Sequence, residues 1–140
     1  MAFPVPSPYF RRSRPVYALL VTLVLGAGLL WRSHFFPLPK FASKYGGDGL
    51  WALLVFFGFG FLFYRASTQR IALLALTFAW CIEFSQMYHA QWIHALRATR
   101  IGRLILGSTF NYPDLFAYLG GISIGAFLEL LFHKRLLSSR

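Results

Sequence analysis

Four apolar stretches divide the chain, and polar residues gather between them. They cover residues 16–31, 50–64, 71–88 and 113–132. Apolar runs of this kind are typical of membrane-spanning helices, because about 20 residues cross a hydrocarbon core of about 30 Å. We therefore predict an all-α integral membrane protein, with four transmembrane helices in a single domain at residues 16–133. The second stretch is short and must draw in flanking residues to reach across.

Residues 91–106, between the last two stretches, interleave apolar side chains with Arg97, Arg100 and Arg103. Residues three apart share a helix face over two turns, so the pattern predicts an amphipathic helix lying at the membrane interface. The arginines could together bind a phosphate or a carboxylate. Alternatively, they contact phospholipid headgroups without selectivity while Arg97 neutralises Glu83.

The composition supports a membrane protein. Of the residues, 57% are hydrophobic and 13% are charged, which is too little polar surface to cover a soluble globule. The formal net charge of +10 favours anionic lipid headgroups as a partner. No basic-aromatic module stands apart from the apolar stretches, so we expect no nucleic-acid binding. Cys81 is the single cysteine, which leaves no intrachain disulfide.

The distribution of positive charge predicts the topology. Arginines precede the first apolar stretch, as in a signal peptide, but no small-x-small cleavage site follows, so we expect an uncleaved anchor. Eight Lys and Arg residues lie on the side of the termini, against six on the other side. This favours cytoplasmic termini, with a proline- and arginine-rich arm at residues 1–15 and a basic tail at residues 134–140.

All four carboxylates, Asp48, Glu83, Asp114 and Glu129, lie inside or at the mouth of an apolar stretch. Ionisable groups are costly there and are functional candidates by default. In the predicted topology, Asp48 begins the second helix, and it converges with Glu83 and Asp114 on the outer leaflet. Gln86 shares a helix face with Glu83 and could hydrogen-bond either Glu83 or a ligand. Asp114 also suits a helix start, so capping alone is the alternative for this residue.

The fourth stretch carries a stripe of small residues at positions 117, 121 and 125. Such a stripe lets another helix approach closely, and we expect this neighbour to be the third helix. That packing would bring Asp114 near Glu83. Near the inner end, one carboxylate is predicted to pair with a cation: Glu129 with Arg65, Arg70 or Lys134.

Catalytic and metal-binding patterns are weak. His89 and His94 are five residues apart, do not share a helix face and lack a third ligand, so we predict no metal site. Ser85 has no histidine placed to activate it. Enzymatic activity is left open, since Glu83 or Asp114 could act as a general base on a lipid-linked phosphate. No cofactor is indicated.

Short motifs over residues 44–125 suggest a family. They are Lys44-Tyr45-Gly46-Gly47-Asp48-Gly49-Leu50-Trp51, Glu83-Phe84-Ser85-Gln86, Arg97-Ala98-Thr99-Arg100, and Asp114-Leu115 with Tyr118 and Gly121. The set resembles an uncharacterised bacterial domain-of-unknown-function family of small inner-membrane proteins. That family is similar to the VanZ-like proteins, which are associated with glycopeptide resistance and envelope functions. Tyr118 stands where the VanZ-like pattern has an asparagine.

The resemblance implies a location in the bacterial cytoplasmic (inner) membrane and one constellation of site residues: Asp48, Glu83, Gln86, Arg97, Arg100 and Asp114. Two functional hypotheses follow. In the first, these residues bind an anionic membrane lipid or a lipid-linked envelope precursor at the outer leaflet. In the second, the protein is an accessory subunit of a larger membrane complex and contacts its protein partner through the N-terminal arm.

Overall fold

The computed structural model describes residues 11–33 and 35–138, with side chains described as far as residue 133, and within these residues it is all-helical. The helices are α1 (Arg14–Arg32), α2 (Lys40–Leu62), α3 (Thr68–Ser85), α4 (Gln91–Ala98), α5 (Arg100–Leu106) and α6 (Tyr112–Ser138). The all-α prediction is confirmed. Most of the predicted arm and part of the basic tail lie outside the described residues.

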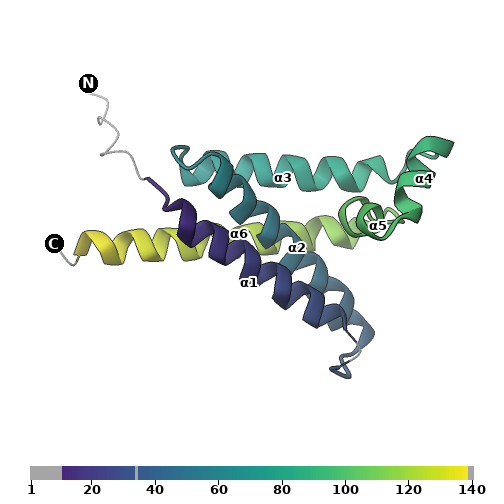
Figure 1. Ribbon diagram of the computed structural model, residues 1–140, viewed down its shortest axis with the longest axis horizontal. Helices are drawn as coiled ribbons and strands as arrows, with labels where there is room; N and C mark the ends of the chain where they lie inside the picture. Colours follow the sequence, from purple (N-terminus) through teal and green to yellow (C-terminus); the bar gives the residue numbers. More distant parts are fainter. Residues whose placement is uncertain (1–10, 34, 139–140) are drawn as a thin grey trace.

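The helices form a bundle centred on α2, which packs against α1, α3 and α6. In Figure 1, α1 and α2 make a hairpin that crosses α3 and α6, and these last two helices run alongside each other. The short helices α4 and α5 lie where α3 ends and α6 begins. The buried core contains Tyr17, Ala52, Phe56, Phe57, Ile71, Ala75, Ala79, Tyr118 and Ile122.

Three helices in the described part of the chain are long and apolar enough to cross a membrane: α1, α2 and residues 112–133 of α6. Their mean hydropathies are 1.6, 1.4 and 1.8. Large apolar side chains such as Leu23, Phe116 and Phe127 are more than half exposed on their outer faces. Both features indicate a membrane protein, because exposing apolar side chains to lipid is favourable, whereas exposing them to water is not.

The fourth predicted span is not supported. Helix α3 has 18 residues, begins with Thr68, Gln69 and Arg70, and carries Glu83 near its end. The apolar segment between them, residues 71–82, measures about 18 Å at 1.5 Å per residue. That is well short of the hydrocarbon thickness, so α3 does not qualify on length and composition.

Helix α2 begins ten residues earlier than predicted, at Lys40 rather than Leu50. The predicted boundary followed the apolar residues alone and left out the glycines that precede them. In the structure these glycines make room for α1: a Cβ on Gly46 would lie 2.6 Å from the Trp31 ring, and one on Gly47 would lie 3.0 Å from Arg32 Nε. Asp48 is consequently an interior residue of α2, not its first.

The small-residue stripe of α6 faces α2 rather than the predicted third helix. A Cβ on Gly121 would lie 2.2 Å from the carbonyl oxygen of Gly49, and one on Gly125 would lie 2.8 Å from the Phe56 ring. A glycine on α2 therefore meets a glycine on α6, and the backbones approach closely. The sequence shows both glycines but not that they belong to facing helices.

The predicted single amphipathic helix is two helices, because the chain is extended at Thr99 between α4 and α5. The Thr99 hydroxyl accepts a hydrogen bond from the Gly102 backbone N–H at 3.0 Å and so caps the start of α5. A Cβ at Gly102 would lie 1.7 Å from the Leu96 carbonyl oxygen, so this junction requires glycine. The break prevents Arg97 and Arg103 from sharing one continuous helix face.

Glu129 pairs with Arg12 instead of the predicted Arg65 or Arg70, and the side chain of Lys134 lies outside the described residues. The guanidinium of Arg12 contacts both carboxylate oxygens, at 2.9 and 2.5 Å. The hydroxyls of Tyr17 and Thr68 also donate to this carboxylate. The predicted pairing with Arg65 or Arg70 was wrong, because Arg12, just before α1, contacts Glu129 on α6.

Candidate functional site

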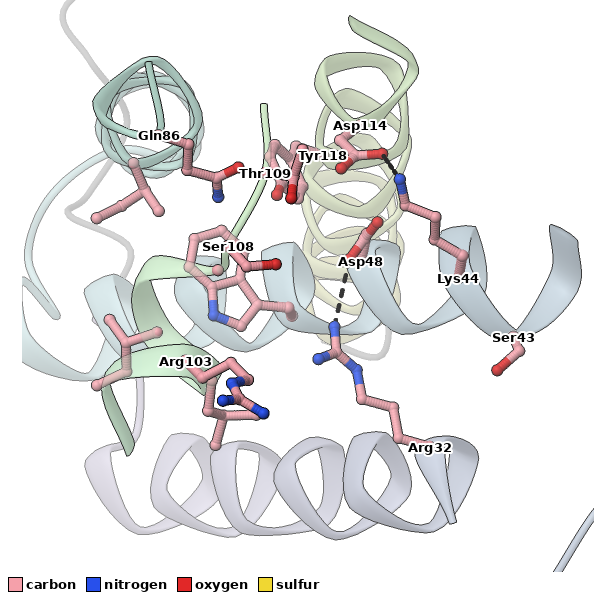
Figure 2. Close-up of a pocket in the computed structure, with 15 residues that line it drawn as sticks. Arg32, Ser43, Lys44, Asp48, Gln86, Arg103, Ser108, Thr109, Asp114 and Tyr118 are labelled. Atoms are coloured by element: carbon pink, nitrogen blue, oxygen red, sulfur yellow. Dashed lines mark hydrogen bonds and ion pairs between the residues drawn. The ribbon is translucent and has the colours of Figure 1, made fainter. Parts of the chain in front are cut away.

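A polar cavity of about 510 Å³ lies at the end of the bundle that carries α5. Figure 2 shows side chains from α1, α2, α3, α5, α6 and the segment before α6 around it. The polar lining residues are Arg32, Ser43, Lys44, Asp48, Gln86, Arg103, Ser108, Thr109, Asp114 and Tyr118. The cavity therefore joins parts of the chain that are far apart in sequence.

Two ion pairs connect the helices around this cavity. Arg32 on α1 lies 3.2 Å from Asp48 on α2, and Lys44 on α2 lies 3.1 Å from Asp114 on α6. Lys44 and Asp48 are four residues apart, so they share one face of α2. The two cations are nearly half exposed, which makes each pair worth about 1 kcal/mol or less. Their side chains are thus accessible to a ligand.

Glu83 is fully buried and lies behind Tyr118, outside the cavity lining. One carboxylate oxygen accepts from the Asn111 backbone N–H at 2.7 Å, and the other accepts from the Tyr118 hydroxyl at 2.8 Å. The side-chain amide of Asn111 also donates to the Asp114 carboxylate at 3.1 Å. Glu83 therefore holds the start of α6 against the end of α3 and, through Tyr118, supports the cavity wall.

Gln86 follows α3 and is 4% exposed. Its side-chain N–H donates to the Leu106 carbonyl oxygen at 2.8 Å, joining α3 to the end of α5. Gly107 next to that carbonyl has a φ of 66°, and a Cβ there would lie 2.3 Å from the Gln86 amide nitrogen. The glycine is needed both for this left-handed turn and for the approach of Gln86.

Arg97 and Arg100 do not line the cavity, contrary to the predicted constellation. Arg97 is buried and donates to the backbone carbonyls of Ser85 at 2.6 Å and Tyr88 at 3.0 Å. It thus satisfies carbonyls at the end of α3, a role that its charge also suits. Arg100 is exposed at the start of α5.

The structure brings together Asp48, Gln86 and Asp114 from the predicted set and adds three cations, Arg32, Lys44 and Arg103. Sequence reasoning missed Arg32 and Lys44 as site residues because their positions depend on how α1 and α2 pack. A signal for Lys44 was available, since it precedes Asp48 by one helical turn. That signal required α2 to begin early enough to include both.

A family model described as a protein of unknown function, DUF2809, matches residues 37–122. The chain belongs to the DUF2809 family. The predicted membership of a domain-of-unknown-function family is confirmed. The match covers every residue of the polar cavity except Arg32. No solved structure matches the chain.

A second cavity, of about 250 Å³, borders the first and is mainly apolar. It lies between α1, α2 and α5. Its lining residues on α1 come before residue 37 and are therefore outside the DUF2809 match. Its apolar lining includes Val24, Leu25, Leu29, Leu50, Leu54 and Trp51. Arg32, Trp51, Leu104 and Ile105 contribute to both cavities, so a polar chamber and an apolar groove share one wall.

The histidines of this DUF2809 protein that fall in the described region do not form a metal centre. His89 and His94 stack with ring centroids 5.6 Å apart. No group of three or more His, Cys, Asp or Glu side chains suited to a metal ion occurs within the described residues. His89, just before α4, therefore stacks on His94 within α4.

Proposed function

We propose that this DUF2809 protein binds an anionic amphiphile, either a phospholipid or a lipid-linked envelope precursor, at one membrane interface. The observation that carries the proposal is the polar cavity adjoining an apolar groove, with four residues common to both. An amphiphile needs this pairing, because its headgroup must remain solvated by polar groups while its chain leaves water.

The charges around the polar cavity support an anionic headgroup. Arg32 and Lys44 each pair with a carboxylate, whereas Arg103 has no ion pair among the described residues. Figure 2 shows the Arg103 side chain beside the cavity. An arginine guanidinium offers several N–H donors in a fixed plane and suits phosphate oxygens. Of the three arginines that the sequence suggested for an anion, Arg97, Arg100 and Arg103, only Arg103 lines the cavity.

Replacing Arg103 with glutamine is expected to reduce bound anionic lipid about tenfold. A hydrogen bond to a charged group contributes about 1.5 kcal/mol, and 1.4 kcal/mol corresponds to a factor of ten in affinity. Bound lipid is counted by native mass spectrometry of gently solubilised protein. Because Arg103 makes no ion pair in the described region, this substitution leaves no carboxylate unpaired.

Arg70→Gln is the matched control, since Arg70 is an exposed arginine at the opposite end of α3 from the cavity. It removes the same charge without touching the proposed site. An equal loss of lipid in both variants would mean that the positive surface attracts headgroups without selectivity, which contradicts the proposal. Circular dichroism should show the same helix content in all three proteins.

We further propose, as the VanZ-like resemblance implies, that the protein resides in the bacterial inner membrane and, as the distribution of Lys and Arg implies, that its termini are cytoplasmic. Because the apolar segment of α3 is too short to cross on its own, this topology requires α3 to cross packed against α6, beside which it lies (Figure 1) and whose Tyr118 pairs with Glu83 near the end of α3. Glu83 receives a hydrogen bond from Tyr118, so the chain departs from the VanZ-like pattern, which has asparagine there, at a residue that contacts Glu83. An active periplasmic reporter fused after Arg140 would contradict this topology.

The accessory-subunit alternative stays a prediction. It depends on the N-terminal arm, and residues 1–10 lie outside the described part of the chain. The same mass spectra address it, because a stable complex would show the mass of an additional protein.

A further inference from the structure

Two buried hydrogen-bond acceptors belong to residues of the polar cavity and have no hydrogen-bond partner in the described part of the chain. They are Oδ2 of Asp48 and Oε1 of Gln86. Asp48 uses its other oxygen for Arg32, and Gln86 uses its amide nitrogen for the Leu106 carbonyl. That carbonyl can only accept, so the nitrogen must face Leu106 and the oxygen is left for another donor.

Unpaired acceptors constrain the chemistry of a ligand. Buried polar groups in proteins almost always have a hydrogen-bond partner, so a ligand in this cavity is expected to donate hydrogen bonds to these two oxygens. A fully ionised phosphate supplies acceptors only. It would suit Arg103 and leave Asp48 and Gln86 unsatisfied. The headgroup must therefore combine an anionic part with separate N–H or O–H donors.

The donors are better matched by neutral hydroxyls than by an ammonium group. Gln86 is uncharged, and Asp48 already pairs with Arg32. The cavity lining holds three cations, Arg32, Lys44 and Arg103, against two carboxylates, Asp48 and Asp114, so its formal charge is already positive before an ammonium is added. A hydroxyl satisfies an amide or carboxylate oxygen without adding charge.

We infer that the headgroup is a phosphodiester bearing free hydroxyls, as in a glycerol-phosphate or sugar-phosphate lipid. The inference rests on the proposed function and specifies the ligand class of the same site. Arg103 binds the phosphate, while Gln86 and Asp48 accept from the hydroxyls. Figure 2 shows Gln86 and Arg103 on different sides of the cavity, which separates the two parts of the headgroup. The lipid chain lies in the adjoining apolar groove.

A competition between matched lipids tests the inference. Purified full-length protein is incubated with equal amounts of phosphatidylglycerol and phosphatidylmethanol that have identical acyl chains, and bound lipid is measured by native mass spectrometry. Both lipids carry one phosphodiester charge, but only phosphatidylglycerol has free hydroxyls. We expect the wild-type protein to prefer phosphatidylglycerol roughly 25-fold, the contribution of two ordinary hydrogen bonds, one to Gln86 and one to Asp48.

Asp48→Asn should reduce this preference to about fivefold, which corresponds to loss of one of the two hydrogen bonds while the one to Gln86 remains. Arginine requires an acceptor, so the asparagine oxygen stays on Arg32 and its amide donor takes the place of Oδ2. Arg70→Gln, far from the cavity, should keep the wild-type preference. If Asp48→Asn does not fold, the wild-type comparison alone decides the inference.

The other outcomes separate this inference from the proposed function. Equal binding of phosphatidylglycerol and phosphatidylmethanol, both above neutral diacylglycerol, overturns the hydroxyl assignment but leaves anionic-lipid binding intact. Phosphatidylethanolamine bound as well as phosphatidylglycerol also overturns it, in favour of an ammonium donor. Anionic lipids bound no better than diacylglycerol overturn both proposals. Preference for a polyprenyl-phosphate sugar over phosphatidylglycerol supports the hydroxyl assignment and identifies an envelope precursor as the source.

Discussion

Replacing Gly121 with alanine is expected to lower the free energy of unfolding by about 3 kcal/mol, at the upper end for an overpacked core. The new Cβ would lie 2.2 Å from the carbonyl oxygen of Gly49 and 3.0 Å from its carbonyl carbon. Both atoms belong to the backbone of α2, so no side-chain rotation relieves the contact. Helices α2 and α6 must move apart, and the packing of Phe56 against Gly125 changes with them.

Gly120→Ala is the control, because Gly120 is the neighbouring helical glycine and a Cβ there meets nothing within 4 Å. Alanine is favoured over glycine in a helix by up to about 1 kcal/mol, so this substitution should be neutral or stabilising. Unfolding followed by circular dichroism in a fixed detergent should therefore show a loss of stability for Gly121→Ala and no loss for Gly120→Ala. Equal destabilisation by both variants would contradict the close contact between α2 and α6.

The same contact positions the candidate site. Gly49 follows Asp48 on α2, and Gly121 lies one turn after Tyr118 on α6, so displacement of these helices changes the cavity walls. Gly121→Ala should consequently also reduce lipid binding, whereas Gly120→Ala should not. Helix packing and the proposed binding function are thus linked through one pair of glycines.

Sequence reasoning succeeded where a local pattern decides the structure. The apolar runs predicted helices over most of α1 and α6, and the rarity of carboxylates drew attention to Asp48 and Asp114. Both residues line the polar cavity, together with Gln86. Ionisable groups in apolar surroundings must find partners, so their positions carry information even without a structure.

Sequence reasoning failed where packing between distant segments decides. The glycines before Asp48 lie outside the predicted apolar stretch, but they are part of α2, and Trp31 and Arg32 fill the space beside them. Arg97 has the spacing of an anion-binding residue but satisfies backbone carbonyls after α3. Neither outcome can be obtained from periodicity, because each depends on the path of the chain outside the segment concerned.

At the opposite end of the bundle, Glu129→Gln should lower the free energy of unfolding by about 3 kcal/mol. Arg12 and Glu129 have side chains at most 1% exposed and are joined by two hydrogen bonds. Glutamine keeps the size of the side chain but removes the charge and one acceptor, which leaves a buried guanidinium without its carboxylate. Tyr17 and Thr68, which donate to the same carboxylate, lose part of their hydrogen bonding as well.

A double-mutant cycle isolates the contribution of the ion pair. Arg12→Gln together with Glu129→Gln removes both charges, so the double variant should be less destabilised than the sum of the single variants, with a coupling of about 1–3 kcal/mol. Arg14→Gln is a nearby control: Arg14 is exposed and stacks on Tyr64 at 4.5 Å, a contact worth about 1 kcal/mol or less. Additive effects of Arg12→Gln and Glu129→Gln would show that the two charges do not stabilise each other. Coupling would show that the Arg12–Glu129 ion pair stabilises the contact between α6 and the segment before α1. This contact helps to position α1, which forms one wall of the apolar groove.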